Sequence, residues 1–355
     1  MFAYILRRMI YAVPILIGVN LITFMLFFMV NSPEDMARAQ LGAKQVSPQM
    51  IQAWKEQRGY DKPLFINPNA EGVSVVTDTL FMKESLKLFT FNFGISDSNR
   101  NIGSDIKERM GPSLAIALPT FMIALITNIS LALLLVLFRG SVLDTSMMIV
   151  AVMIMSISGL FSIIAGQVLF SKMWHWVPIS GYDSGWSGIK FIILPVMIGV
   201  FAGIGSGVRW YRSIFLEQIN QDYVRTARAK GLSELRVLFG HVLRNGMLPI
   251  LTGVVVVIPS LFMGSLIMES FFGIPGLGSY TIDAISSQDF GIVKAMVFLG
   301  SVLYIVGLIL TDISYTLFDP MVKLLYFLYF GQIYCFGAYS VYLYFWDGAH
   351  LVLLR

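Results

Sequence analysis

"SLAIALPTFMIALITNISLALLLVLF" occupies residues 113–138 and contains no charged side chain. A helix rises about 1.5 Å per residue, so this stretch is longer than the ~30 Å thickness of the hydrocarbon core of a bilayer. A water-soluble protein has little use for such a segment. The stretch therefore predicts a helix that crosses a membrane.

The rest of the chain has the same character. Of its 355 residues, 56% are hydrophobic and only 13% are charged, whereas soluble domains carry about 25% charged residues. Five further apolar runs cover residues 9–30, 145–170, 189–208, 247–268 and 295–311. We therefore expect an all-α polytopic membrane protein with six transmembrane helices.

The first run raises the question of a secretory signal peptide. Arg7 and Arg8 precede it, and residues 37–39 (Ala-Arg-Ala) resemble a cleavage site. However, residues 9–30 are far longer than the 7–15 residues of a signal-peptide core. We favour an uncleaved first helix, with the amino end in the cytoplasm.

The charge of the connecting segments indicates which side each one faces. Cytoplasmic loops are enriched in Lys and Arg. If the amino end is cytoplasmic, the most basic of the joints between the spans also lies on the cytoplasmic side. This joint, residues 209–246, holds seven basic residues against three acids. Residues 31–112 then form a long extracytoplasmic region, and residues 113–323 form a five-helix core. The tryptophans at 174, 176 and 186 fit an aromatic belt on the outer side.

The basic joint contains signals for two short helices. Ile214 to Lys230 has helical apolar spacing, and Gly231 suits a left-handed helix end. Ser233 then reads as an N-cap, followed by a second helix with one apolar side made of Leu235, Leu238, Phe239 and Val242. Membrane topology alone needs only scattered basic residues. A capped helix pair also fits a docking element for a soluble partner, while nothing else in the chain supports nucleic-acid binding.

The same joint resembles the cytoplasmic "EAA" loop of ABC-importer permeases, in the form used by the oligopeptide/dipeptide/nickel family. The resemblance is to the B-type permeases, nearest to the oligopeptide- and microcin-type subgroup. It rests on the sequence "ARAKG" (227–231) and on a downstream His, Arg, Asn and Pro. Arg225 and Thr226 depart from the general EAA consensus in a way that is usual for the peptide branch. By resemblance, the ATPase-docking loop comprises Arg225, Thr226, Ala227, Arg228, Ala229, Lys230, Gly231, His241, Arg244 and Asn245.

Other stretches resemble this family in order and spacing: "DKPLF" (61–65), "FNFGIS" (91–96), "VPISGY" (177–182) and "DISYTLFDP" (312–320). The resemblance implies an inner-membrane permease subunit with a second permease, two ATP-binding-cassette ATPases and an extracytoplasmic binding protein as partners. It implies no cofactor on this chain, since ATP and Mg belong to the ATPases. Peptides are the expected cargo, with nickel chelates, glycosides and peptide-like antibiotics left open.

Residues 324–355 form a seventh hydrophobic segment that the family pattern does not explain. The family pattern normally closes near Asp319-Pro320, and Met321 replaces the usual Arg. The Tyr- and Phe-rich tail could span the membrane, lie at its interface, or result from a misread gene end.

A glycine-rich outer segment follows the fifth predicted span. "FFGIPGLG" (271–278) is either a simple turn between helices or a partly re-entrant segment that borders the solute path, since irregular backbone can line a cavity. The resemblance favours the second interpretation. The candidate residues are Glu269, Gly273, Pro275, Gly276 and Gly278.

Several classes of site are absent from the sequence. It has no G-x-x-x-x-G-K-[ST] phosphate loop. Its three histidines, at 175, 241 and 350, are far apart, and its single cysteine, Cys335, excludes an internal disulfide and a cysteine metal cluster. An ion-coupled secondary transporter and a channel are the rival functions, although no clear mid-span acid supports ion coupling. "MMIVAVMIMS" (147–156) suits ordinary packing, or else an adaptable solute path.

Overall fold

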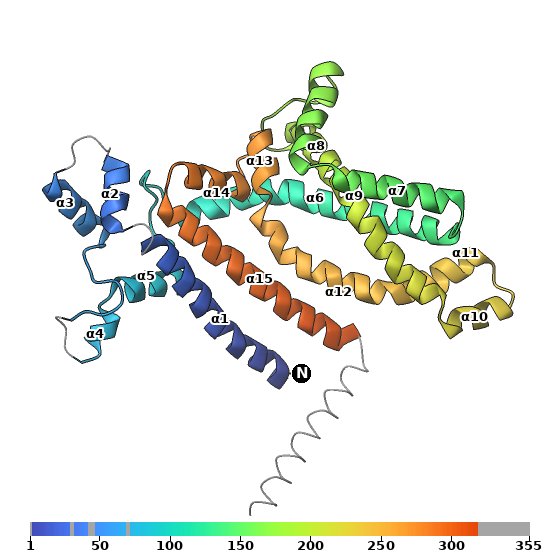
Figure 1. The fold of residues 1–355 in the computed structure, drawn as a ribbon, viewed down its shortest axis with the longest axis horizontal. Helices are drawn as coiled ribbons and strands as arrows, with labels where there is room; N and C mark the ends of the chain where they lie inside the picture. Colours follow the sequence, from blue (N-terminus) through green and yellow to red (C-terminus); the bar gives the residue numbers. More distant parts are fainter. Residues whose placement is uncertain (1, 29–31, 42–46, 69–71, 319–355) are drawn as a thin grey trace, which may run out of the picture.

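The computed structural model describes residues 2–28, 32–41, 47–68 and 72–318, and every element assigned there is a helix. The molecule is an elongated bundle of long helices with short helices at its two ends (Figure 1). The prediction of an all-α membrane protein is therefore confirmed. The predicted tail, residues 324–355, lies outside the described residues.

Five stretches are long and apolar enough to cross a membrane, and up to six if one bent pair counts as a single span. The five belong to α1 (Phe2–Phe28), α6 (Ile102–Leu137), α9 (Ile189–Ile219), α12 (Arg244–Ser260) and α15 (Phe290–Phe318). In this bundle α6 packs against α9, while α15 packs against both α1 and α12. α12 ends before the predicted limit of 268, in a 3₁₀ turn (Leu261–Met263) that Gly264 closes.

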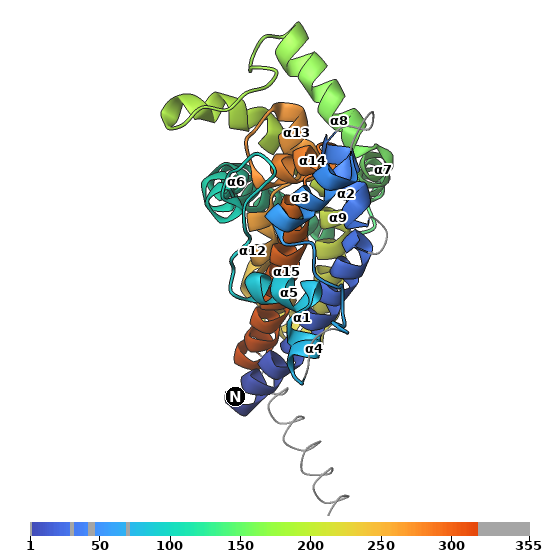
Figure 2. The same cartoon turned by 90° about the vertical axis from the view of Figure 1, so that its left-hand side faces the viewer.

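The third predicted span, residues 145–170, is not one straight helix. It consists of α7 (Val142–Ser156), α8 (Gly159–Gly166) and a π-helical extension (Gln167–Met173), with a bend of 92° between the two halves. Ile157 and Ser158 between them are extended, with ψ angles of 127° and 138°. Sharp bends commonly occur at Ser/Gly pairs, and Ser158-Gly159 is such a pair. Figure 2 shows α8 rising away from the bundle.

The region predicted to be extracytoplasmic folds onto one end of α1 and α15. It contains α2 (Pro33–Leu41), α3 (Pro48–Arg58), α4 (Ser74–Thr77) and α5 (Leu80–Phe89). α3 is capped by the Ser47 side chain and closed by Gly59 in the left-handed conformation. These helices lie at the opposite end of the molecule from α10 (Asp222–Ala229) and α11 (Glu234–Val237) (Figure 1).

A buried ion pair attaches the α2–α5 region to the last long helix. Lys294 of α15 donates to Glu84 of α5, and both side chains are about nine-tenths buried. Burial alone raises the pKa of Glu84, but attraction to Lys294 and Lys87 outweighs it and brings that pKa to about 2. Glu84 is therefore ionised at neutral pH, and the pair holds α5 in place.

Candidate functional site

The basic joint forms a helical hairpin at one end of the bundle. The first helix, α10, begins at Asp222 and not at Ile214 as predicted, because α9 continues to Ile219 before the chain turns. Lys230 closes α10, and Gly231 follows with a φ of +77°. The second arm is α11 together with a π-helical turn, Leu238–Leu243. The hairpin joined at a glycine is thus present, with a shifted start.

One face of the hairpin is built into the protein's own core. Val224 and Ala227 of α10 are 0% and 4% exposed. They pack into one cluster with side chains from α6, α9 and the second arm. Burial of this face seats the hairpin on the ends of two long helices, because the apolar contacts stabilise one position. The cluster contains Ala132, Leu133, Val136, Phe215, Ile219, Val237, Leu238, Val242 and Ile250.

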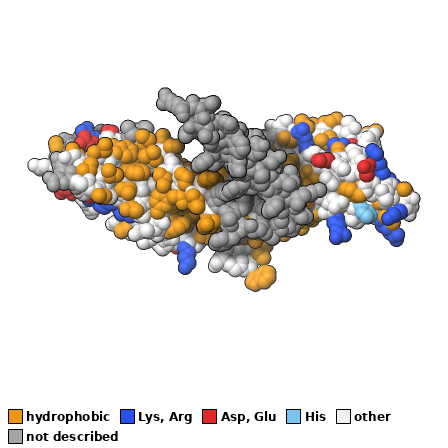
Figure 3. Space-filling view, turned by 90° about the horizontal axis from the view of Figure 1, so that it is seen from below, with side chains coloured by type: hydrophobic (Ala, Val, Ile, Leu, Met, Phe, Trp, Pro, Cys, Tyr) orange, Lys and Arg blue, Asp and Glu red, His pale blue; other side chains and the backbone are white. Residues whose placement is uncertain are grey.

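The opposite face is open. Most of the predicted docking residues are exposed: Arg225, Thr226, Ala229, Lys230, Gly231, Arg244 and Asn245. Arg228 and His241 are half-buried, and Ala227 is buried. Ala227 therefore packs within this chain and is not on the open face. Lys and Arg side chains gather at this end of the molecule (Figure 3).

An ion pair braces the hairpin across its turn. Arg228 Nε and Nη2 donate to the two carboxylate oxygens of Glu234, at 2.8 and 3.1 Å. The pair connects α10 to α11 on either side of Gly231, and a bidentate geometry fixes the angle between the two arms. Sequence inspection did not identify this pair.

The second arm exposes two large apolar side chains. We expected Leu235, Leu238, Phe239 and Val242 on one apolar side. The structure buries Leu238 and Val242 but leaves Leu235 and Phe239 each 56% exposed. Residues four apart share one helix face, so these two form a small apolar patch beside the basic residues. Their spacing was visible in the sequence, but which of the four faced outward was not.

The glycine-rich outer segment is built around one buried carboxylate. Glu269 of α13 (Leu266–Phe272) is 1% exposed. Its Oε2 accepts from the amides of Gly278 and Ser279 at 2.7 and 3.1 Å, and its Oε1 accepts from Ser265 N at 3.1 Å. The first two amides open α14 (Leu277–Ser286), so the carboxylate also meets the positive end of that helix.

The glycines let the backbone close around this carboxylate. Gly273 adopts a φ of +64°, which ends α13. A Cβ on Gly278 would lie 2.6 Å from the Ser265 carbonyl oxygen, and one on Gly276 would lie 2.5 Å from Ser113 Oγ. Pro275 is exposed between them. The segment is therefore a tightly packed turn, and its position beside a solute path stays a prediction.

The outer segment borders a cavity and contacts α8. The cavity, about 420 Å³, lies between α6, α9 and the end of α12, and Glu269 and Ser113 are among its lining residues. On the other side, Gln167 Nε2 donates to the carbonyls of Phe271 and Ile179 at 3.2 and 3.1 Å. Gln167 thus joins the glycine-rich segment, at Phe271, to the loop that contains Ile179.

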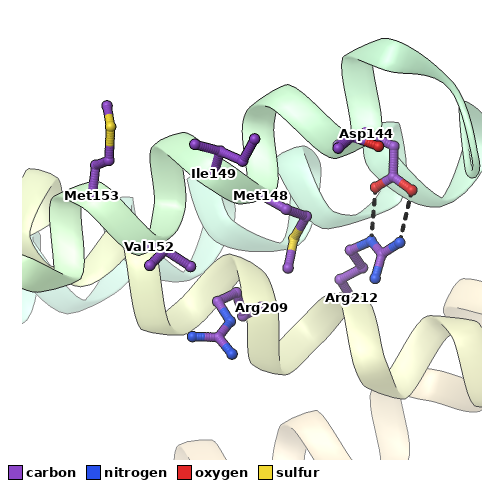
Figure 4. Close-up of a pocket in the computed structure, with 8 residues that line it drawn as sticks. Asp144, Met148, Ile149, Val152, Met153, Arg209 and Arg212 are labelled. Atoms are coloured by element: carbon purple, nitrogen blue, oxygen red, sulfur yellow. Dashed lines mark hydrogen bonds and ion pairs between the residues drawn. The ribbon is translucent and has the colours of Figure 1, made fainter.

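An open groove lies between α7 and α9 (Figure 4). Its volume is about 470 Å³, and its floor and walls include Met148, Ile149, Val152 and Met153. At one end Arg212 binds Asp144 through two hydrogen bonds of 2.9 and 2.7 Å. The remaining side chains that line the groove are Thr145 and Arg209. Elsewhere in the described part of the chain, no group of three or more His, Cys, Asp or Glu could hold a metal ion.

Comparisons with known proteins cover nearly the whole chain. Residues 128–324 match the family model for the binding-protein-dependent transport system inner membrane component, and residues 1–115 match the amino-terminal model of such membrane components. A Brucella abortus protein whose name describes a peptide transport system permease is 32% identical, over 91% of this chain and 99% of that protein. The oligopeptide transport system permease protein AppB of Bacillus subtilis is 29% identical, over 91% of this chain and all of that protein. The di/tripeptide transport system permease protein DppB of Pseudomonas aeruginosa is also 29% identical, over 91% and 99%.

Proposed function

We propose that this chain, which belongs to the family of binding-protein-dependent transport system inner membrane components, imports peptides as one permease subunit of an ATP-driven transporter. The relatives are named as peptide, oligopeptide and di/tripeptide permeases, which supports peptides as the solute. The same relatives favour this function over an ion-coupled transporter or a channel.

The α10–α11 hairpin carries the proposal. In an ATP-driven transporter, a membrane subunit that has no ATP-binding loop receives its energy through contact with the ATPase chain. The hairpin has a rigid base, because Val224 and Ala227 are buried in the core, and an exposed face with basic residues and the Leu235–Phe239 patch. Aromatic side chains, such as Phe239, and Arg side chains are enriched in protein interfaces. We assign this face as the binding surface for the ATPase.

The remaining partners follow from the family. A second permease subunit completes the path, two ATPases bind the two hairpins, and an extracytoplasmic protein delivers the solute to the α2–α5 end. The amino end and the hairpin face the cytoplasm. ATP and Mg²⁺ bind to the ATPases, and this chain binds neither.

Copurification and solute uptake together test the docking claim. The permease, its partner permease and the ATPases are expressed together, and the amount of ATPase retained on the tagged permease is measured. Gly231→Val should reduce coupled uptake, because a β-branched residue disfavours the φ of +77° at the turn. The permease itself should still insert, since no atom lies within 4 Å of a Cβ at this position. Unchanged uptake by this variant would contradict docking at the hairpin.

Cysteine labelling tests the orientation. In a Cys335→Ser background, intact cells are treated with a membrane-impermeant thiol reagent. A cysteine at Asn67, in the extracytoplasmic region, should react, and one at Ser233, in the hairpin, should not. The reverse pattern would place the hairpin outside and refute both the topology and the docking site.

A further inference from the structure

The groove between α7 and α9 contains a cation that the proposed machinery does not use. Arg209 is exposed, and its one hydrogen bond within the described residues runs from Nη1 to Met155 Sδ, at 3.4 Å. None of the carboxylates that the structure describes forms an ion pair with it. Arg212, one turn further along α9, is instead neutralised by Asp144. The groove therefore carries an uncompensated positive charge.

This charge is directed away from the hairpin end of the bundle. Asp144 stands at the start of α7, and Ala151 lies about 10 Å further along that helix. A Cβ on Gly205 would lie 2.6 Å from the Ala151 carbonyl oxygen, so the helices cross closely there. Because Arg209 reaches Met155 beyond this crossing, its guanidinium is directed away from the Asp144 end of α7, and Arg209 itself lies within the stretch Trp186–Ile219 that is long and apolar enough to cross a membrane.

An arginine at this depth requires water or a binding partner. A lipid-facing Arg near a helix end extends toward the aqueous interface, and ionisable side chains that remain at membrane depth face a bundle interior or a water-filled cavity. The bend at Ile157 and Ser158 agrees with this, because irregular backbone within the membrane is tolerated where it lines such a cavity. The side of the groove that contains Arg209 is therefore the water-accessible side of this subunit.

The walls of the groove suit a ligand of variable shape. Met148, Ile149, Val152 and Met153 line it, and methionine adapts readily to different apolar groups. Its volume, about 470 Å³, is within the range of small-molecule sites. One fixed cation beside an adaptable apolar wall fits a class of solutes that share an anionic group and differ elsewhere.

We propose that Arg209 binds a carboxylate of the transported solute within the α7–α9 groove. This inference rests on the proposed import of peptides, since linear peptides share a terminal carboxylate whatever their side chains. The guanidinium can bind that carboxylate through two parallel hydrogen bonds. The methionine-rich wall accommodates the variable side chains.

The first test measures the charge and hydration of the groove without any transport. Val152→Cys is introduced into the Cys335→Ser permease, and the complete transporter is placed in lipid nanodiscs. Its reaction rates with an anionic and a cationic methanethiosulfonate reagent are compared. Arg209→Gln should lower the anion-to-cation rate ratio about tenfold, because one unit charge near the thiol acts in opposite directions on the two reagents. Arg209→Lys should preserve the ratio.

A matched control removes a different cation. Lys172 is exposed in the π-helical extension of α8 and does not line the groove. Lys172→Gln should leave the rate ratio unchanged. An unchanged ratio in Arg209→Gln would overturn the proposal, as would a thiol that reacts with lipid-soluble N-ethylmaleimide but with neither charged reagent, because the groove would then be filled with lipid.

The second test measures uptake of trialanine and of trialanine amide in proteoliposomes that contain the complete transporter and its binding protein. Arg209→Gln should raise KM for trialanine about tenfold or more while leaving KM for the amide unchanged. Because both peptides are compared in both proteins, any preference of the binding protein cancels. Equal losses for the two peptides would show a structural or subunit contact and overturn the proposal.

The two tests separate this inference from the proposed function. If the wild-type transporter imports neither peptide but the labelling ratio depends on Arg209, peptide import fails and the anion site stands. If peptides are imported and neither measurement depends on Arg209, the proposed function stands and this inference fails.

Discussion

The α10–α11 hairpin and the α13–α14 turn are both short helix pairs joined at glycine, but they place their charges in opposite ways. In the hairpin, Arg228 and Glu234 pair at the surface, and nothing lies within 4 Å of a Cβ on Gly231. In the turn, Glu269 is buried and bonded to backbone amides, and Gly276 and Gly278 have no room for a side chain. The hairpin therefore exposes its charged side chains at the surface, whereas the turn uses its charged side chain to fix the conformation of the backbone.

This difference assigns different consequences to similar substitutions. If the open face of the hairpin binds the ATPase as proposed, a change there weakens that contact and leaves the fold intact. A change in the turn leaves buried amides without an acceptor or forces the backbone apart, and so lowers stability. The following predictions test this contrast, beginning with the largest expected effect.

Removal of the buried carboxylate should have the largest effect. Glu269→Ala leaves the amides of Ser265, Gly278 and Ser279 without their acceptor, which we expect to cost about 3 kcal/mol or more. The measurement is thermal unfolding of the purified transporter in detergent. Glu234→Ala, which removes an exposed carboxylate from the hairpin, is the matched control and should cost less than about 1 kcal/mol. Similar losses of stability in both variants would contradict the difference between the buried carboxylate of the turn and the exposed carboxylate of the hairpin.

Alanine at the glycines should give the next effect. Gly278→Ala brings a methyl group against the Ser265 backbone, and overpacking of this kind costs about 1–3 kcal/mol. Gly231→Ala meets only open space, and its cost is the ~1 kcal/mol of a left-handed backbone. Unfolding temperatures of the two variants compare them directly. A larger loss at Gly231 than at Gly278 would mean that the turn is looser than its contacts indicate.

The sequence predicted the helical class, five of the spans and the glycine-joined hairpin, because apolar length and helix-ending residues are local signals. It placed the start of α10 too early, since the apolar spacing of Ile214 and Phe215 continues smoothly from α9. It predicted a single span at 145–170 but not its bend, because hydropathy does not register a bend at Ser158. These features depend on tertiary packing.

The candidate sites show the same limit. The sequence identified Glu269 and its glycines as a group, but their hydrogen bonds join residues of two helices and could not be read from spacing. Ala227 was predicted to face a partner, and it packs inside. Arg209 was noticed only as one of seven basic residues in the joint, because its position against Met155 depends on how α7 and α9 cross.

Both regions expose apolar side chains, but only those of the hairpin should contribute to binding of the ATPase. Leu235→Ser with Phe239→Ser removes the patch on the hairpin and should weaken ATPase binding at least tenfold, while the unfolding temperature stays nearly unchanged. The matched control is Leu266→Ser with Phe271→Ser, since those side chains of α13 are 47% and 44% exposed. The control should retain the ATPase. Loss of the ATPase in both variants would indicate that the effect does not arise at the hairpin.

The surface ion pair should give the smallest effect, and its sensitivity to salt should identify its origin. Arg228 and Glu234 are 31% and 56% exposed, so water and ions screen their attraction. A double-mutant cycle with Arg228→Gln and Glu234→Gln should give a coupling of about 0.5 kcal/mol at low salt, and it should fade toward zero at 1 M salt. The loss caused by Glu269→Ala should persist at both salt concentrations, because its amide partners are buried. The cycle is measured in the permease without its ATPases, and a coupling above about 2 kcal/mol that resists salt there would contradict the exposure of Arg228 and Glu234.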